Sequence, residues 1–167
     1  MEGMKLSRGP LIAITVLRVF VGWHFLYEGL TKLTAPSWSA AGYLKQARGP
    51  LAEQFRWLAT QPDMLANADL VTMWGLTLVG LFLILGLFTR LASLAGIGFI
   101  LLFYLATPPF IGYFYSIPSE GSYLIVNKNL VELCALVVIL VTRSGLFAGL
   151  DRIVHGLIAR RPTLAAA

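Results

Sequence analysis

Four long apolar stretches divide the chain. They cover residues 11–30, 71–88, 91–107 and 124–142. Each falls within the ~17–25 residues that a membrane-spanning helix needs. Only Thr89 and Arg90 separate the second stretch from the third, which predicts an antiparallel hairpin, and Pro108 and Pro109 end the third because proline lacks an amide donor. The pattern predicts an all-α integral membrane protein, a four-transmembrane-helix bundle.

The segments outside these stretches are amphipathic. Leu51, Phe55 and Leu58 recur at helical spacing after Pro50, which is typical of a helix that lies in the membrane interface. Residues 33–70 are therefore expected to form a long outer loop that carries an interfacial helix. Residues 143–161 alternate apolar and basic positions, which predicts an amphipathic tail on the inner surface, near anionic lipid. We interpret residues 1–167 as a single membrane domain.

The composition supports a lipid environment. Hydrophobic residues make up 57% of the chain and charged residues 13%, whereas an ordinary soluble domain carries about 25% charged residues. The single cysteine, Cys134, excludes an internal disulfide. Basic residues occur in ones and twos along the chain, without the clustering that a nucleic-acid partner requires. The bilayer is therefore the expected partner, and nucleic acid is not.

Charged residues inside the first stretch stand out from this background. Arg18, His24, Glu28 and Lys32 fall within an arc of about 120° when residues are placed 100° apart around a helix. A charged side chain at the bilayer centre costs at least ~2.5–3.5 kcal/mol, so it rarely faces lipid. We therefore expect this stripe to face the interior of the bundle.

The fourth stretch supplies a matching set. Asn127, Lys128 and Glu132 lie near its start, at the depth where the first stretch ends with Glu28 and Lys32. Two acids and two bases at one level can neutralise one another, which offsets much of their desolvation cost. One interpretation is an ion-paired lock with no chemistry. The other is an outer polar pocket whose carboxylates exchange protons with a redox-active ligand.

The pocket interpretation assigns roles to individual residues. Glu28 and Glu132 are the catalytic candidates, as proton donors and acceptors. The candidate ligand-binding residues are His24, Lys32, Trp74, Tyr104, Tyr113, Asn127 and Lys128. No metal or haem is predicted, because the two histidines, His24 and His155, are expected at opposite sides of the membrane.

Three strings of the sequence together resemble the DoxX family. They are GWHFLYEGLTKL (22–33), GLFLILGLFTRLASL (80–94), and NKNLVEL followed by GLFAGLDR (127–152). The family includes the membrane subunit of thiosulfate:quinone oxidoreductase. The resemblance implies a four-helix protein of the bacterial inner (cytoplasmic) membrane. It also implies a quinone-interacting subunit of an oxidoreductase complex, with quinone as cofactor and a protein partner. The alternative is a noncatalytic membrane anchor or assembly subunit.

The distribution of basic residues predicts that both termini face the cytoplasm. The termini and the hairpin turn hold Lys5, Arg8, Arg90, Arg143, Arg152, Arg160 and Arg161. The opposite loops hold Lys45, Arg48 and Arg56, with Lys32 and Lys128 at helix ends. Cytoplasmic loops carry the excess of lysine and arginine. A periplasmic reporter should therefore be active when inserted within residues 40–60 and inactive when fused after Ala167. Strong activity of the C-terminal fusion would reverse the orientation.

Overall fold

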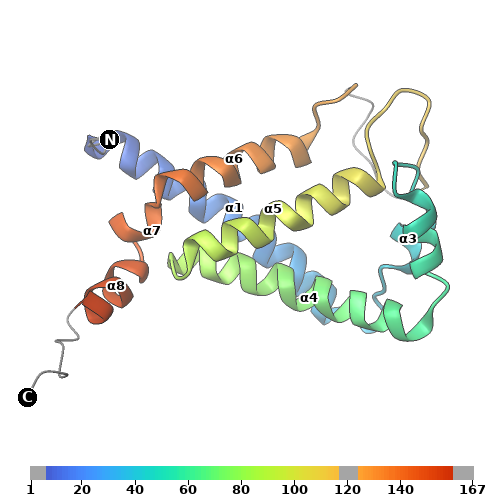
Figure 1. The fold of residues 1–167 in the computed structure, drawn as a ribbon, viewed down its shortest axis with the longest axis horizontal. Helices are drawn as coiled ribbons and strands as arrows, with labels where there is room; N and C mark the ends of the chain where they lie inside the picture. Colours follow the sequence, from blue (N-terminus) through green and yellow to red (C-terminus); the bar gives the residue numbers. More distant parts are fainter. Residues whose placement is uncertain (1–6, 117–123, 160–167) are drawn as a thin grey trace, which may run out of the picture.

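The computed structural model describes residues 7–116 and 124–159, and the elements in these ranges are helices. They are α1 (Arg8–Thr34), α2 (Ala41–Lys45), α3 (Ala52–Leu58), α4 (Pro62–Leu85), α5 (Thr89–Ala106), α6 (Lys128–Thr142), α7 (Ser144–Phe147) and α8 (Asp151–Ala159). The four longest, α1, α4, α5 and α6, form an elongated bundle (Figure 1). Helices α2 and α3 lie at one end, here called the outer end, and α7 and α8 lie at the other, the inner end (Figure 1).

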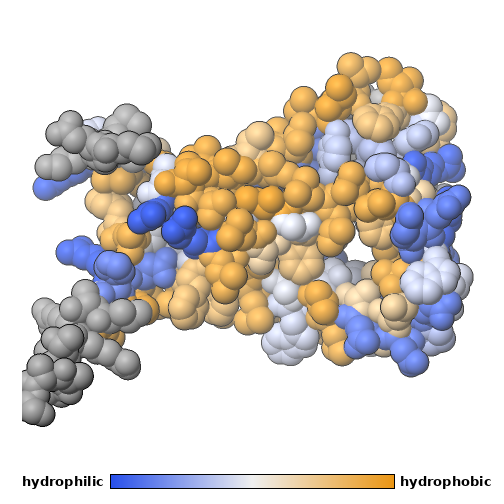
Figure 2. Space-filling view, in the orientation of Figure 1, coloured by the Kyte–Doolittle hydropathy of each residue, from blue (hydrophilic) through white to orange (hydrophobic). Residues whose placement is uncertain are grey.

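Three of these helices, α1, α4 and α5, are long and apolar enough to cross a membrane. Large apolar side chains cover the middle of the molecule, and hydrophilic residues gather toward the ends (Figure 2). Phe20 and Val141, for example, are each 69% exposed, which suits contact with lipid. Helix α6 has 15 residues, fewer than the predicted fourth span of 124–142, so a fourth crossing stays a prediction.

Two boundaries differ from those expected. Helix α4 begins at Pro62, well before residue 71, because proline fits the first turn of a helix and Asp63 is favourable there. Helix α6 begins at Lys128 rather than 124. Leu124 has a positive φ of 66°, and the Asn127 side chain caps the helix by accepting a hydrogen bond from the Leu130 amide at 3.1 Å.

Glycines bring α1 and α4 into close contact. A β-carbon on Gly29 would collide with the backbone and hydroxyl of Thr77, and one on Gly80 would collide with the Leu26 backbone. Gly22 also lies against Gly80, and the Gly22 carbonyl oxygen would collide with a β-carbon on Gly80. Close approach through small residues is how helices pack in membranes, where lipid removes the hydrophobic drive for association. The α1–α4 contact is accordingly the most extensive between any two helices.

The apolar core fills the space between the four long helices. Its buried members are Val21, Phe25, Leu76, Val79, Leu83, Ala92, Ile100, Leu136 and Ile139. The side chains of Leu136 and Phe25 pack against Gly96 of α5. A β-carbon on Gly96 would lie only 3.2–3.3 Å from them. The core thus joins the α1–α4 pair to the α5–α6 pair.

The turn between α4 and α5 is held from outside by Asp151, the first residue of α8. Gly86 ends α4 in the left-handed conformation at φ 63°, and the Leu87 amide donates back to Phe82. The Asp151 carboxylate then accepts hydrogen bonds from the Phe88 amide at 2.6 Å and the Thr89 amide at 3.0 Å. Asp151 therefore caps the N-terminus of α5, where the residue before the helix, Phe88, has no side-chain group that could do so.

Backbone contacts reinforce this attachment. The Leu150 amide donates to the Leu85 carbonyl at 3.1 Å, and the Asp151 amide donates to the Gly86 carbonyl at 2.8 Å. Gly149 lies so close to Gly86 that a β-carbon on either residue would contact the other. The start of α8 is therefore docked on the α4–α5 turn by four hydrogen bonds, two through its backbone and two through its carboxylate.

We predict that Asp151→Ala destabilises the bundle. It removes two charge-assisted hydrogen bonds and a negative charge at a helix N-terminus, which together contribute about 1–2 kcal/mol. Thermal and denaturant unfolding in detergent would measure the loss. Arg152→Ala is the control, because the neighbouring Arg152 side chain is exposed. Equal stability of the two variants would contradict the capping role.

At the outer end, Tyr43 of α2 fixes the loop onto α5. Its hydroxyl donates to the Phe103 carbonyl at 2.8 Å and contacts the Thr107 hydroxyl at 2.7 Å. Its ring meets the Phe103 ring edge to face. Burial raises the pKa of Tyr43 to about 12, against an ordinary value of 10.0.

These contacts predict an alkaline loosening of the outer end. Because the folded pKa of Tyr43 lies above its ordinary value, its stabilising contribution is complete below pH 10 and disappears as the pH rises through about 12. Tyrosinate absorbance should show a late transition near pH 12 that Tyr43→Phe removes. Hydrogen exchange of residues 41–58 should accelerate over the same pH range. Persistence of the late transition in Tyr43→Phe would assign it to another tyrosine.

Candidate functional site

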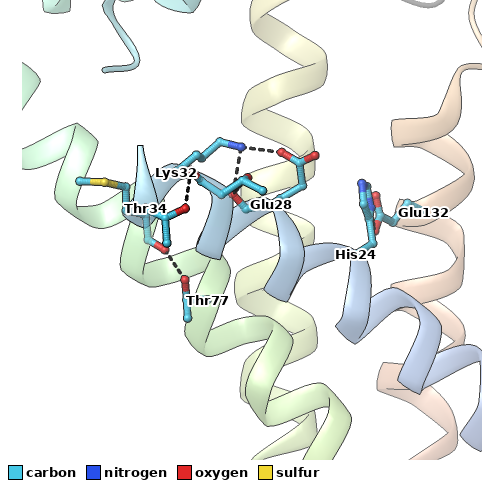
Figure 3. A network of polar contacts seen from close by, with 8 residues as sticks. His24, Glu28, Lys32, Thr34, Thr77 and Glu132 are labelled. Atoms are coloured by element: carbon cyan, nitrogen blue, oxygen red, sulfur yellow. Dashed lines mark hydrogen bonds and ion pairs between the residues drawn. The ribbon is translucent and has the colours of Figure 1, made fainter. Parts of the chain in front are cut away.

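Two polar pairs lie toward the outer end of the bundle, one between α1 and α6 and the other within α1 (Figure 3). His24 Nδ1 is 2.7 Å from Glu132 Oε1, so a hydrogen bond joins α1 to α6. Lys32 Nζ is 2.5 Å from Glu28 Oε2, one turn apart on α1 itself. Figure 3 shows His24 and Glu132 facing each other, with Glu28 and Lys32 on the following turns of α1. His24 therefore joins the charged residues of α1 to α6, and the functional roles predicted for these residues stay predictions.

The His24–Glu132 pair is shielded on one side and open on the other. The Glu132 side chain is 10% exposed, whereas the His24 side chain is 44% exposed. A carboxylate accepts, so Nδ1 carries the proton in this hydrogen bond. His24 Nε2 has no partner among the described residues. Nε2 can therefore accept a hydrogen bond from a ligand when the ring is neutral, or donate one when the ring is protonated.

Electrostatic interactions connect the two pairs. The charge of Lys128, at the start of α6, interacts with His24 and with Glu28, and the charge of Glu28 interacts with His24. Lys32 also donates to the Glu28 carbonyl at 3.1 Å and lies 5.7 Å from the centre of the Trp38 ring, within cation–π range. His24, Glu28, Lys32, Lys128 and Glu132 thus form one group, which we call the outer polar cluster.

The other predicted ligand-binding residues have different contacts. Asn127 caps α6, and the Tyr104 hydroxyl donates to the Ile125 carbonyl at 2.8 Å, so both hold the start of α6. Tyr113 packs against Phe110 in the loop after α5, with ring centres 6.0 Å apart. Trp74 lies on the outside of α4 with 53% exposure. Asn127 and Tyr104 therefore position α6, and a direct role in ligand binding stays a prediction for all four residues.

Arg18 belongs to a separate polar group at the inner end. It is 2% exposed, its Nη2 donates to the Ala148 carbonyl, and its Nη1 lies 3.5 Å from the Ser144 hydroxyl. Asp151 acts on it electrostatically. The helical stripe predicted that Arg18 faces inward, but it could not separate Arg18 from the outer polar cluster.

Sequence reasoning missed Ser144 and Asp151 as partners of this inner group. No local pattern indicates these contacts, because Asp151 accepts from the amides of Phe88 and Thr89, more than 60 residues earlier in the sequence. Among the described residues, no three His, Cys, Asp or Glu side chains are grouped in a way that could hold a metal ion.

A family model named DoxX matches residues 13–108, which is more than half of the chain. The chain belongs to the DoxX family. The matched region of this DoxX protein contains His24, Glu28 and Lys32 and reaches the end of α5, whereas Glu132 and Asp151 lie beyond it. No match was found among curated proteins or among solved structures.

The outer polar cluster is suited to proton transfer. An imidazole hydrogen-bonded to a carboxylate holds a proton close to a second acceptor, and the partly exposed ring can pass it to a bound group. Lys32 and Lys128 supply positive charge that would stabilise negative charge developing on a ligand. The pair therefore has the components of an acid–base site with an opening on the side of His24.

Proposed function

We propose that this DoxX protein is a quinone-interacting subunit of a bacterial oxidoreductase complex in the inner membrane. The observation that carries the proposal is the His24–Glu132 hydrogen bond, which leaves His24 Nε2 open in a half-exposed side chain. A hydrogen-bonding and proton-transferring group on an apolar membrane helix is costly, so it is a functional-site hypothesis by default. Quinone is soluble in the lipid that surrounds this helix.

The residues of the cluster fit a quinone headgroup. A bound quinone would accept two electrons and two protons. His24 Nε2, when protonated, would donate a hydrogen bond to one carbonyl oxygen, while Glu132 holds the ring in place and balances its positive charge. Glu28 is 45% exposed and can exchange protons with water near the outer surface. Lys32 keeps Glu28 oriented and adds positive charge beside the ligand.

The electron donor is expected on a separate protein. The chain would then contribute the lipid-facing quinone site, and a partner would carry the oxidised substrate. The resemblance of the sequence to the DoxX family suggests thiosulfate:quinone oxidoreductase as one such complex.

A second candidate function is supported by the same hydrogen bond. His24 and Glu132 connect α1 to α6, and removing either partner from such a pair leaves an unpaired polar group. In this interpretation the protein is a noncatalytic anchor or assembly subunit, and the charged pairs fix the bundle without touching a ligand.

Glu132→Gln is expected to separate these functions. Glutamine preserves the shape and can still accept from His24 Nδ1, but it cannot balance a protonated imidazole. We expect quinone binding to weaken about tenfold, equivalent to ~1.4 kcal/mol, while the protein still folds. Binding of a short-chain quinone analogue to the protein in nanodiscs can be followed by quenching of tryptophan fluorescence. Glu53→Gln is the matched control, because Glu53 of α3 is exposed.

The anchor function predicts a different pattern. Glu132→Gln would then leave quinone quenching at the level of the control while lowering the free energy of unfolding, by up to ~1.5–3 kcal/mol for a charge-assisted hydrogen bond. The double variant His24→Phe, Glu132→Leu would regain that stability. This outcome would remove the quinone site and leave only the lock between α1 and α6.

A further inference from the structure

A cavity of about 280 Å³ opens at the outer end, away from the outer polar cluster. It lies where three segments meet, namely the end of α2, the middle of α3 and the loop after α5. Its lining residues are Lys45, Gln46, Ala47, Arg48, Arg56, Phe114 and Ser116. Pockets for drug-sized ligands occupy ~300–1,000 Å³, so this cavity suits a small group. Three of its seven lining residues are cations.

The walls of the cavity are fixed by hydrogen bonds. The amides of Arg48 and Gly49 both donate to the Ala106 carbonyl, at 3.0 and 3.3 Å, which attaches the link between α2 and α3 to the end of α5. Gln46 Oε1 accepts from the Ser116 amide at 2.7 Å and so closes the side formed by the second loop. Ala47, between these contacts, is 1% exposed. The cations therefore stand on a preformed frame.

The positive charge of this cavity is not balanced within residues 7–116 and 124–159. Lys45, Arg48 and Arg56 form no ion pair with a carboxylate of these ranges. Arg56 Nη1 donates to the Ala47 carbonyl at 3.3 Å, which holds its guanidinium toward the cavity. Like charges held together repel one another, and an anion between them relieves the repulsion. Arginine is also the side chain best shaped to bind phosphate oxygens.

Exposed apolar side chains border the cations. Phe114, which lines the cavity, is 81% exposed, and Ile111 of the same loop is 73% exposed. Trp57, one residue after Arg56 on α3, is 54% exposed. Aromatic residues beside basic ones are typical of the membrane–water interface, where rings sit at the level of lipid headgroups.

From this juxtaposition we propose that the cavity formed by Lys45, Arg48 and Arg56 binds a phosphate group at the outer end of the bundle. The group is carried either by an anionic lipid headgroup or by a free phosphate-type ion. The two arginines bind its oxygens, Lys45 adds a third positive charge, and Gln46 and Ser116 complete the polar wall. The site is independent of quinone binding at His24.

The test compares the full chain with a Lys45→Gln, Arg48→Gln, Arg56→Gln variant. Inorganic phosphate is titrated against each protein in detergent, with Tm and isothermal titration calorimetry as readouts. In a second arm, each protein is placed in nanodiscs of phosphatidylcholine alone or with one-fifth phosphatidylglycerol. Arg90→Gln is the control, because it removes an exposed cation from the inner end. If the triple variant does not fold, Lys45→Gln, Arg48→Gln replaces it, since it keeps the Arg56 hydrogen bond.

We expect at least tenfold weaker phosphate binding, or loss of the Tm increase given by phosphatidylglycerol, in the variant and not in the control. An effect of phosphatidylglycerol without one of phosphate assigns the site to a lipid headgroup, and the reverse assigns it to a free ion. Equal binding by the variant and the full chain would overturn the proposal.

Discussion

The contact between α1 and α4 determines how the rest of the molecule is arranged. Because Gly22, Gly29 and Gly80 have no side chains, the two helices meet almost backbone to backbone, with the face of α1 that holds Gly22 and Gly29 turned to α4. At 100° per residue, His24 and Glu28 then lie about 160° and 120° around the helix from Gly22. The polar stripe of α1 is consequently turned away from α4, and His24 meets Glu132 of α6. Packing by the smallest residues thus decides where the most polar residues point.

The local part of this arrangement could be predicted from sequence. Apolar length located three helices that can cross a membrane, and helical periodicity placed the charged residues of α1 on one stripe. The partner of Glu132 could not be predicted, because it depends on the rotation of two helices that are 108 residues apart in sequence. The start of α4 at Pro62, before the predicted apolar stretch, could not be predicted from apolar length either, because Asp63, Asn67 and Asp69 make residues 62–70 polar.

The two ends of the bundle are closed in different ways. At the inner end, Asp151 and the backbone of residues 149–151 bind directly to the α4–α5 turn, and Arg18 reaches the same region from α1. At the outer end, the amides of Arg48 and Gly49 bind the Ala106 carbonyl at the end of α5. The side chains of Tyr43 and Gln46 add contacts to α5 and to the loop after it. Both ends therefore combine backbone docking with side-chain hydrogen bonds, through a carboxylate and a guanidinium at the inner end and through a phenol and an amide at the outer end.

The unequal lengths of the helices affect the surrounding bilayer. At 1.5 Å per residue, α1 and α4 rise about 40 and 36 Å, whereas α5 and α6 rise about 27 and 22 Å. The hydrocarbon core is about 30 Å thick, so α1 and α4 exceed it and α5 and α6 fall short. Lipids beside α5 must compress to cover its shorter apolar surface, at a cost of a fraction of a kcal/mol per ångström. This hydrophobic mismatch draws headgroups inward beside α5, so the end of α5 that binds the Tyr43 hydroxyl lies closer to the polar surface than the average bilayer thickness implies.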